Sequence, residues 1–296
     1  TGCPWKFYPE SAGNMERIVF EIDGLQCAYV HQENRKTRAV LKIERLMLPM
    51  GKVTVILGLS GSGKSTLIET LGLMNHTIGR GAITYHHQGG KITIDKEIWK
   101  DPAALAGIRN RHFSFIFQKD FLMPYYTAEE NMLIGLLIGG GNRVNPDAQR
   151  TLQELCGKMG LNFEEIRKKR PSELSVGQKQ RLSFIRAVLK DHAVIFGDEP
   201  TGNLDEVNAG LLMDVLHTSI SQHPERSAVL VSHNIQLSVA KADCIVVLSP
   251  CSDNMYEIRP GSVFSRNAGG WANNLRELIP DDSLSRQIRE IVNSGS

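Results

Sequence analysis

The segment Gly58–Thr66, GLSGSGKST, constrains the fold of this 296-residue chain more than any other feature. It follows the apolar run Val53–Leu57, typical of a buried strand, and leads into the apolar-periodic segment Thr66–Leu73, which predicts a helix. Glycines at these positions let successive backbone N–H groups turn inward around phosphate oxygens, and the helix start adds positive potential. The sequence therefore predicts a strand, a phosphate-binding loop and a helix, in that order.

Further apolar runs predict that this loop belongs to a parallel α/β core. Four runs follow it, separated by segments of helical spacing: Phe113–Phe117, Ala193–Phe196, Ala228–Val231 and Cys244–Leu248. Strands that are apolar throughout are typical of a sheet covered by helices on both faces. An antiparallel sheet beside the core is predicted from three alternating patches, Ile18–Ile22, Ala82–Tyr85 and Lys91–Ile94.

The chain also divides into segments of different character. We expect a lead-in over residues 1–17, one domain over residues 18–250 and a C-terminal extension over residues 251–296. Inside the domain, Asn145 and Pro146 predict the start of a helix in a helical lobe at about residues 118–180, and Gly160 predicts its end. Two amphipathic patterns predict short helices in the extension: Trp271, Leu275, Leu278 and Ile279, then Leu284, Ile288, Ile291 and Val292.

Charge and composition exclude several classes of function. The chain has 34 Lys and Arg against 32 Asp and Glu, a formal net charge of +2, so no general affinity for nucleic acid is expected. The longest apolar run, Met132–Ile138, is far short of the roughly 20 residues that cross a bilayer. The N-terminus lacks the basic and apolar pattern of a secretory signal. We therefore expect a cytoplasmic chain that forms no pore.

The cysteines favour reduced thiols over a disulfide framework. They are five and scattered, with no CxxC pair: Cys3, Cys27, Cys156, Cys244 and Cys251. The adjacent His86 and His87 are a possible metal pair, but no third ligand is apparent and the glycines after them favour a turn. No stable zinc site is expected.

Two further patterns suit phosphate chemistry. Asp198 and Glu199 follow the apolar run Ala193–Phe196, and the carboxyl end of a parallel strand is where such a sheet has its ligand crevice. One acid there can hold Mg²⁺ and the next can polarise a water, although without the loop a helix-capping pair would be the simpler interpretation. Ser175 and Gly177 precede a helical segment, which indicates either an ordinary cap or a second phosphate contact.

Taken in order, six elements resemble the ATPases of the ABC family: the loop at 58–66, Gln118, LSVGQ at 174–178, Asp198-Glu199, Asn203-Leu204-Asp205 and His233. The resemblance covers about residues 18–248. It implies an α/β fold of the P-loop NTPase type, with a RecA-like parallel-sheet core, an antiparallel β subdomain and an α-helical signature subdomain. It also implies an enzyme, an ATPase that uses ATP and Mg²⁺.

The resemblance assigns roles to individual residues. ATP would be bound by Tyr29, stacked on the base, and around its phosphates by Gly58, Ser60, Gly61, Ser62, Gly63, Lys64, Ser65 and Thr66. A second copy, closing head to tail in a homodimer, would contribute Ser175, Gly177 and Gln178, with Asp205 coupling the two sites. The metal ligands would be Ser65, Gln118 and Asp198, and the catalytic residues Glu199, His233, Gln118 and Lys64. Val176 stands where the common signature has glycine, and we expect it to be tolerated because Ser175 and Gly177 remain.

Three segments are similar to the branch that contains macrolide-exporter, lipoprotein-releasing and cell-division ATPases: Arg109–Gln118, Leu122–Asn131 and Asp198–Asp205. That resemblance implies an integral membrane permease as partner, with this chain held peripherally on the inner face of the cell membrane. An apolar cluster after Gln118 is expected to receive the permease: Phe121, Leu122, Met123, Tyr125 and Tyr126. Two alternatives stay open. One is a regulatory or scaffolding subunit of an envelope complex with no transported substrate. The other is a soluble ATPase that acts on DNA or ribosomes, although the chain lacks the coiled-coil arms and the second cassette expected of that class.

Two features depart from that branch. The stretch between Lys64 and Gln118 is longer than expected, with His86–Gly90 as an extra hairpin. The extension after Pro250 exceeds a minimal ATPase domain, and three uses of it are open: packing back on the core, which we favour, enlarging the dimer contact, or docking a regulator. The basic run Arg167–Arg170 is expected to be a solvated face or else to lie near anionic lipid.

Overall fold

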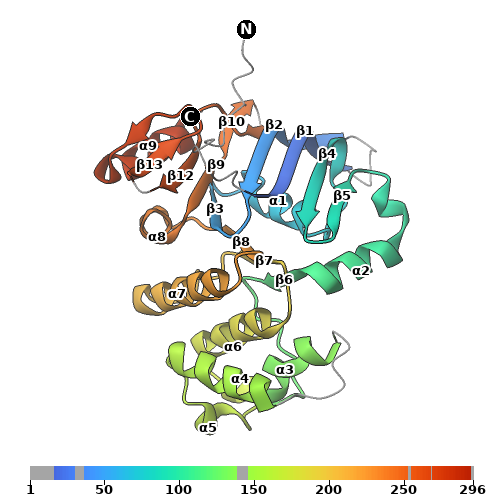
Figure 1. Ribbon diagram of the computed structural model, residues 1–296, viewed down its shortest axis with the longest axis vertical. Helices are drawn as coiled ribbons and strands as arrows, with labels where there is room; N and C mark the ends of the chain where they lie inside the picture. The colour runs from blue at the N-terminus through green and yellow to red at the C-terminus, as the bar shows by residue number, and fades with distance from the viewer. Residues whose placement is uncertain (1–16, 31–36, 139–145, 253–254, 268, 295–296) are drawn as a thin grey trace.

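The computed structural model describes residues 17–30, 37–138, 146–252, 255–267 and 269–294. An antiparallel sheet lies beside the parallel core, and the helical lobe forms the opposite end of the molecule (Figure 1). The predicted lead-in falls almost wholly outside the described residues, as do Cys3 and the predicted helix cap Asn145. Within these ranges, no helix is both long and apolar enough to span a membrane.

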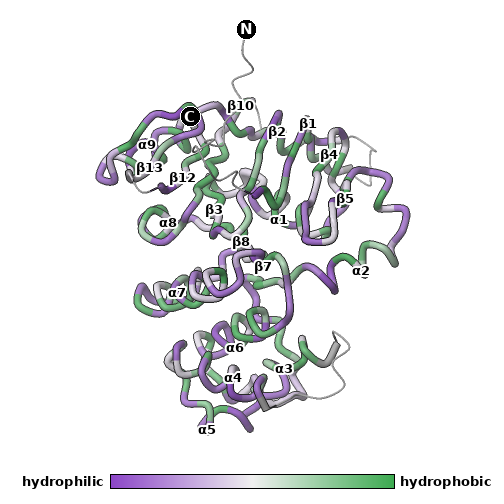
Figure 2. The backbone as a smooth tube through the Cα atoms, in the orientation of Figure 1, coloured by the Kyte–Doolittle hydropathy of each residue, from purple (hydrophilic) through white to green (hydrophobic). Residues whose placement is uncertain are grey.

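The core is an eight-stranded sheet in the order β14-β13-β12-β9-β3-β8-β7-β6. The five strands from β9 to β6 run parallel to one another. Nearly all of their residues are buried, and the tube is predominantly hydrophobic along β3 (Figure 2). The parallel core predicted from the five apolar runs is confirmed. Its strands are β3 (Val53–Leu57), β6 (Phe113–Ile116), β7 (Val194–Asp198), β8 (Ser227–Val231) and β9 (Cys244–Val247).

The second sheet, in the order β10-β11-β2-β1-β4-β5, confirms the predicted antiparallel sheet, except that β11 joins it parallel to β2. β1 pairs antiparallel with β2 and β4, and β4 turns back into β5. The predicted extra hairpin at His86–Gly90 is this turn, in which His87 pairs with Gly90. The strands are β1 (Ile18–Val30), β2 (Thr37–Pro49), β4 (Ile78–His87), β5 (Gly90–Ile94), β10 (Ser249–Ser252) and β11 (Met255–Glu257).

Buried aromatic rings join the two sheets. Phe20 of β1 lies 6.3 Å from Phe113 of β6 and 6.0 Å from Phe196 of β7, measured between ring centroids. Tyr85 of β4 lies 5.1 Å from Phe113 with its ring edge-on. Such pairs are each worth about 1 kcal/mol beyond the area that they bury, so this cluster holds the antiparallel sheet against the core.

The predicted helical lobe is confirmed: the described residues between β6 and β7 form four α-helices and one short 3₁₀ helix. The helix predicted to start at Asn145-Pro146 and to end at Gly160 is α4, which begins at Pro146 and ends at Lys158, with Gly160 at a left-handed φ of 64° two residues later. Around the core lie α1 (Lys64–Leu71), η1 (Ile98–Lys100), α2 (Pro102–His112), α7 (Glu206–Gln222) and α8 (Ile235–Lys241). The lobe contains α3 (Ala128–Ile138), α4 (Pro146–Lys158), α5 (Phe163–Ile166), η2 (Pro171–Glu173) and α6 (Val176–Leu189).

The C-terminal extension contains one of the two predicted helices. The pattern from Leu284 to Val292 is α9 (Asp281–Asn293), whose apolar residues pack into the main core cluster. The extension therefore packs back on the core, as we favoured.

The first predicted helix of the extension is wrong, since its residues form strands that continue the core sheet beyond β9. Trp271 pairs across the sheet with Ile279, and both side chains are buried. Between them Arg276 has a φ of 67°, which breaks any helix, and the side chain of Asn273 accepts hydrogen bonds from two backbone N–H groups of the turn. The strands are β12 (Val263–Asn267), β13 (Gly270–Asn273) and β14 (Leu278–Ile279).

Candidate active site

The glycine-rich loop connects β3 to α1 and is closely packed. Gly61 and Gly63 have φ values of 77° and 86°, a left-handed conformation that glycine adopts without strain. A Cβ atom on Gly58 would lie 2.7 Å from the hydroxyl of Ser62, so only glycine fits there. That Ser62 hydroxyl is buried and has no hydrogen-bond partner among the described residues, which leaves a donor for an anion held by the loop.

Lys64 begins α1 and is folded over the loop. Its Nζ donates hydrogen bonds to the carbonyl oxygens of Gly58, at 3.0 Å, and Leu59, at 2.8 Å. Burial lowers the pKa of Lys64, and the carboxylates of Glu199 and Asp198 oppose that shift. A partly desolvated ammonium beside backbone N–H groups is suited to bind phosphate oxygens.

Asp198 ends β7, next to the loop. The Ser65 hydroxyl donates to Oδ1 of Asp198 at 3.2 Å. Burial raises the pKa of Asp198, and the hydrogen bond from Ser65 opposes the shift while Glu199 and Glu69 add to it. A hydroxyl and a carboxylate at this separation are the hard oxygen donors that Mg²⁺ prefers, so the two residues fit that ion.

Glu199 has a φ of 48°, an uncommon left-handed conformation for a residue with a side chain. Its backbone N–H donates to Val231 of the neighbouring strand β8 at 3.1 Å, and Gly202 donates to its carbonyl oxygen at 3.1 Å. Its carboxylate lies 3.3 Å from Nδ1 of His233, which follows β8 and is exposed. The loop, the two acids and His233 therefore gather at the carboxyl edge of the parallel sheet.

Tyr29, near the end of β1, is attached to the same region through its hydroxyl. That oxygen lies 3.0 Å from the hydroxyl of Thr66 and accepts a hydrogen bond from the Asn75 amide at 3.2 Å. The Asn75 amide also donates to the carboxylate of Glu69 at 3.1 Å. The Tyr29 side chain is 39% exposed, which leaves aromatic surface beside the loop. Asn75 and Glu69 were not predicted, because nothing in their spacing points to Tyr29.

The predicted signature residues form a separate group at the start of α6. Ser175 caps the helix: its hydroxyl accepts from the backbone N–H of Gln178 at 3.2 Å, and the Gln178 side chain accepts from the Ser175 N–H at 2.9 Å. Val176, in the first turn, is 61% exposed, and a Cβ atom on Gly177 would meet nothing within 4 Å. Gln180 of the same helix donates to the backbone of Pro200 at 2.8 Å, which ties α6 to the segment after Glu199.

Asp205 lies at the start of α7, and Gln118 follows the end of β6. Asp205 caps α7 and accepts from the backbone and side chain of Asn208 at 2.9 and 2.6 Å, hydrogen bonds that lower its pKa. Gln118 is exposed just after β6. The backbone of the next residues is fixed to α6, because the Arg186 guanidinium donates to the carbonyl oxygens of Asp120 and Phe121.

An apolar surface follows Gln118. We define the 121–126 surface by four exposed side chains: Phe121, Met123, Tyr125 and Tyr126. The fifth predicted residue, Leu122, is partly buried against the core. The loop is shaped by Asn131, a buried side chain that accepts from Met123 N–H at 2.6 Å and donates to the carbonyl oxygens of Met123, Tyr126 and Thr127. Asn131 was not predicted as a positioning residue, because in sequence it resembles any residue of an amphipathic helix.

No metal centre accompanies the His86-His87 hairpin. Among the described residues, no group of three or more His, Cys, Asp and Glu is arranged to hold a metal ion. The four described cysteines form no disulfide with one another: Cys27, Cys156, Cys244 and Cys251.

The model of one protein family, the ABC transporter family, matches residues 41–202, which include the loop, the signature and both acids. The chain belongs to the ABC transporter family. The lipoprotein-releasing system ATP-binding protein LolD of Desulfotalea psychrophila is 31% identical over 218 residues, 74% of this chain and 92% of the relative. The macrolide export ATP-binding/permease protein MacB of Pasteurella multocida is 32% identical over 234 residues, 79% of this chain but only 33% of the relative. The chain therefore spans about a third of the length of that fused relative.

Solved structures of the ABC cassette MJ0796 are similar in fold to this ABC chain. A dimeric structure of that bacterial transporter cassette superposes with a TM-score of 0.67 at 25% identity, covering 81% of this chain and 96% of the cassette. A second, dimeric structure of MJ0796 in a post-hydrolysis state contains ADP and Pi. The predicted P-loop NTPase fold and the predicted ATPase class are thereby confirmed, and this chain is an ABC cassette.

Proposed function

We propose that this chain is the ATP-hydrolysing subunit of an ABC transporter, working as a head-to-tail homodimer that drives a separate membrane permease. One observation carries the proposal. The carboxyl edge of the parallel sheet brings together a cation, a hydroxyl, two carboxylates and an imidazole, the groups that suit transfer of a phosphoryl group to water. These groups belong to Lys64, Ser65, Asp198, Glu199 and His233.

The roles of these residues follow from their chemistry. The loop N–H groups and Lys64 bind the phosphates, and Lys64 spreads the negative charge that develops on them. Ser65 and Asp198, with Gln118, would hold Mg²⁺, which neutralises phosphate charge when bound. Glu199 accepts the proton of the attacking water, and its contact with Nδ1 of His233 orients the carboxylate. Tyr29 offers a ring for the adenine base.

We propose that the signature residues act on the ATP of the other subunit. The Ser175 cap and the open space above Gly177 place N–H groups and a hydroxyl at the start of a 14-residue helix, where negative phosphate is favoured. These residues hydrogen-bond within their own cap rather than to the Gly58–Thr66 loop, which suits a contact supplied between subunits. Asp205, capping α7, would couple the sites. Because Val176 is exposed and its backbone is helical, it leaves Ser175 and Gly177 free to act.

The permease is proposed to dock on the 121–126 surface. Tyr125 is 84% exposed and lies among three other exposed apolar side chains, a pattern that marks partner sites. Hydrogen bonds from Arg186 and Asn131 hold the backbone of this surface, so a partner would meet a shape already formed. Docking would place the chain peripherally on the inner face of the membrane.

The proposed chemistry is tested by Glu199→Gln, which removes the base and keeps the side-chain shape. We expect ATP turnover to fall at least about 100-fold, while ATP binding and ATP-dependent dimerisation persist, because a general base contributes to the chemical step alone. Turnover is measured by phosphate release and dimerisation by analytical ultracentrifugation. The matched control is Glu206→Gln, an exposed acid in the first turn of α7, which should leave both unchanged. Unchanged turnover in Glu199→Gln would show that another group activates water.

A further inference from the structure

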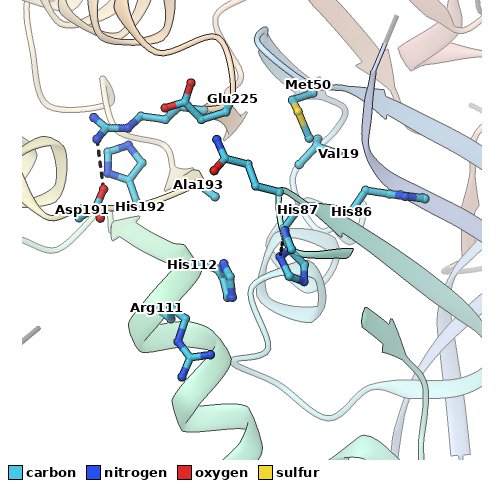
Figure 3. A pocket seen from close by; sticks show the side chains of 13 residues that line it. Val19, Met50, His86, His87, Arg111, His112, Asp191, His192, Ala193 and Glu225 are labelled. Atoms are coloured by element: carbon cyan, nitrogen blue, oxygen red, sulfur yellow. Dashed lines mark hydrogen bonds and ion pairs between the residues drawn. The ribbon is translucent and has the colours of Figure 1, made fainter. Parts of the chain in front are cut away.

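A cavity of about 350 Å³ lies at the edge of the parallel sheet opposite the phosphate loop (Figure 3). β6, β7 and β8 all begin at this edge, whereas the ATP site is at the ends of β3, β7 and β8. The cavity is walled by the extra β4–β5 hairpin, the last residues of α2, the segment before β7 and the turn before β8. None of the roles proposed above uses these residues.

Three imidazoles from different elements meet around this cavity. The rings of His87 and His112 lie 4.8 Å apart between centroids, and His192 lies across the cavity from them (Figure 3). Nδ1 of His87 accepts a hydrogen bond from the N–H of Gly89 at 3.1 Å, so the hydrogen of its neutral ring is on Nε2. Nδ1 of His192 lies 2.6 Å from the carbonyl oxygen of Lys190 and donates to it, so Nε2 of His192 is an acceptor.

His112 is the imidazole whose charge is most sensitive to a ligand. Burial lowers the pKa of His112, and nearby His87 and Arg111 lower it further. The other ring that faces it is Tyr85, 5.6 Å away and neutral because burial raises its pKa. A negative charge placed beside His112 would oppose these effects, raise the pKa of His112 and favour its protonated ring.

The remaining charges of the cavity balance one another. Arg226 is paired with Asp191 at 3.2 Å, but Asp191 is 95% exposed and the contact is easily exchanged. Glu225 also lines the cavity, and its carboxylate lies 3.5 Å from Nδ1 of His223, which is not part of the lining. His86 turns away from the cavity, 3.9 Å from Glu21 (Figure 3). With Arg111, the lining has two arginines against two acids, so protonation of His112 gives it a net positive charge.

We propose that this cavity binds a small hydroxylated anion, carrying a phosphate or a carboxylate group, together with one proton. The Arg226 guanidinium and the Nε2–H of His87 donate to the anionic oxygens, and His112 takes up the proton. Nε2 of His192 accepts from a hydroxyl of the ligand. The volume lies in the range of small-molecule sites. A metal ion fits less well, since it would be repelled by both arginines and would displace protons instead of taking one up.

The experiment is calorimetric titration of the chain saturated with Mg²⁺ and a non-hydrolysable ATP analogue, so that the phosphate loop is filled. Glycerol 3-phosphate and citrate are the probes, which distinguishes a phosphate from a carboxylate ligand. We expect at least one to bind about tenfold more tightly at about pH 6 than at about pH 8, with proton uptake seen as a heat that depends on the ionisation enthalpy of the buffer. Absence of binding by both anions at about pH 6, or binding equal at both pH values, would overturn the proposal. So would binding of Zn²⁺ alone with proton release.

Variants locate the site. His112→Gln should remove the pH dependence and weaken binding at about pH 6 about tenfold, because the charge-assisted contact is lost. His76→Gln is the control, since His76 stacks on Trp99 outside the cavity, and its binding should equal that of the original chain. If His112→Gln does not fold, the pKa of His112 in the unaltered chain is followed by NMR, and the anion should raise it. A His112 pKa that the anion leaves unmoved contradicts the proposal.

Discussion

At the scale of single residues, the candidate active site at the carboxyl edge of the sheet is held by backbone contacts as much as by side chains. Glu199 adopts a left-handed φ of 48°, a conformation that costs a residue with a side chain about 1 to 3 kcal/mol. Hydrogen bonds from its N–H to Val231 and from Gly202 to its carbonyl oxygen offset that cost. In this conformation the carboxylate lies 3.3 Å from Nδ1 of His233, so the strain is part of how the proposed base is positioned.

Burial of His192 leads us to predict that the free energy of unfolding depends on pH. Burial lowers its pKa to about 4, with the hydrogen bond to Lys190 opposing the shift, from an ordinary value of 6.5. Between these values the unfolded chain binds a proton that the folded chain does not, so stability is lost as the pH falls from 6.5 toward 4, by roughly 3 kcal/mol in all. His192→Gln should remove that loss, measured by urea unfolding at a series of pH values. The exposed His76→Gln should not, and parallel curves for the original chain and His192→Gln would contradict the argument.

At the scale of elements, much of the fold could be predicted because buried strands and helix ends leave local signals. Five apolar runs marked the parallel strands, and Pro146 and Gly160 marked α4. Where the same apolar residues fit both a helical and a strand periodicity, the sequence alone can predict the wrong element. The apolar residues from Trp271 to Ile279 fit a helical face, yet Trp271 and Ile279 meet across two strands, since the turn between them depends on Asn273 and on the left-handed Arg276.

The same limit applies to the candidate site. Glycines, Lys64 and the acid pair could be predicted because the chemistry requires those residue types at fixed spacing. Asn75 and Asn131, which hold Tyr29 and the 121–126 surface, could not, since any polar residue is compatible with their local sequence and only the folded chain brings their partners together.

The packing of the last helix, α9, against the core allows a prediction of how much the extension contributes to stability. Ile288 of α9 is fully buried in the main core cluster, so Ile288→Ala should lower the free energy of unfolding by about 3 kcal/mol, through lost burial and the cavity left behind. Its exposed neighbour Arg289 is the matched control, and Arg289→Ala should change stability by less than about 0.5 kcal/mol. Both are measured by chemical denaturation. Equal stability of the two variants would mean that α9 is only loosely attached.

At the scale of the whole molecule, helix α6 of the helical lobe is connected to the segments that flank the candidate site. Gln180 joins α6 to Pro200 just after Glu199, and Arg186 joins α6 to the backbone that follows Gln118. The helix that carries the signature therefore contacts both the segment after the proposed base and the segment that presents the 121–126 surface. If a partner displaced the 121–126 surface, helix α6 would therefore transmit the displacement to the segment that follows the proposed base.

Two exposed apolar side chains at different places test which surface meets the proposed permease. Tyr125 is 84% exposed on the 121–126 surface and Leu278 is 72% exposed on the extension, so aspartate at either position should be tolerated by the fold. We expect Tyr125→Asp to weaken docking about thirtyfold, because loss of a tyrosine anchor at an interface costs about 2 kcal/mol. The fraction of the chain that sediments with membranes should fall, while the turnover of the purified cassette stays the same. Leu278→Asp should change neither. The reverse result would move the docking surface to the extension and favour its use by a regulator, whereas no effect of either variant would favour a cassette that works apart from the membrane.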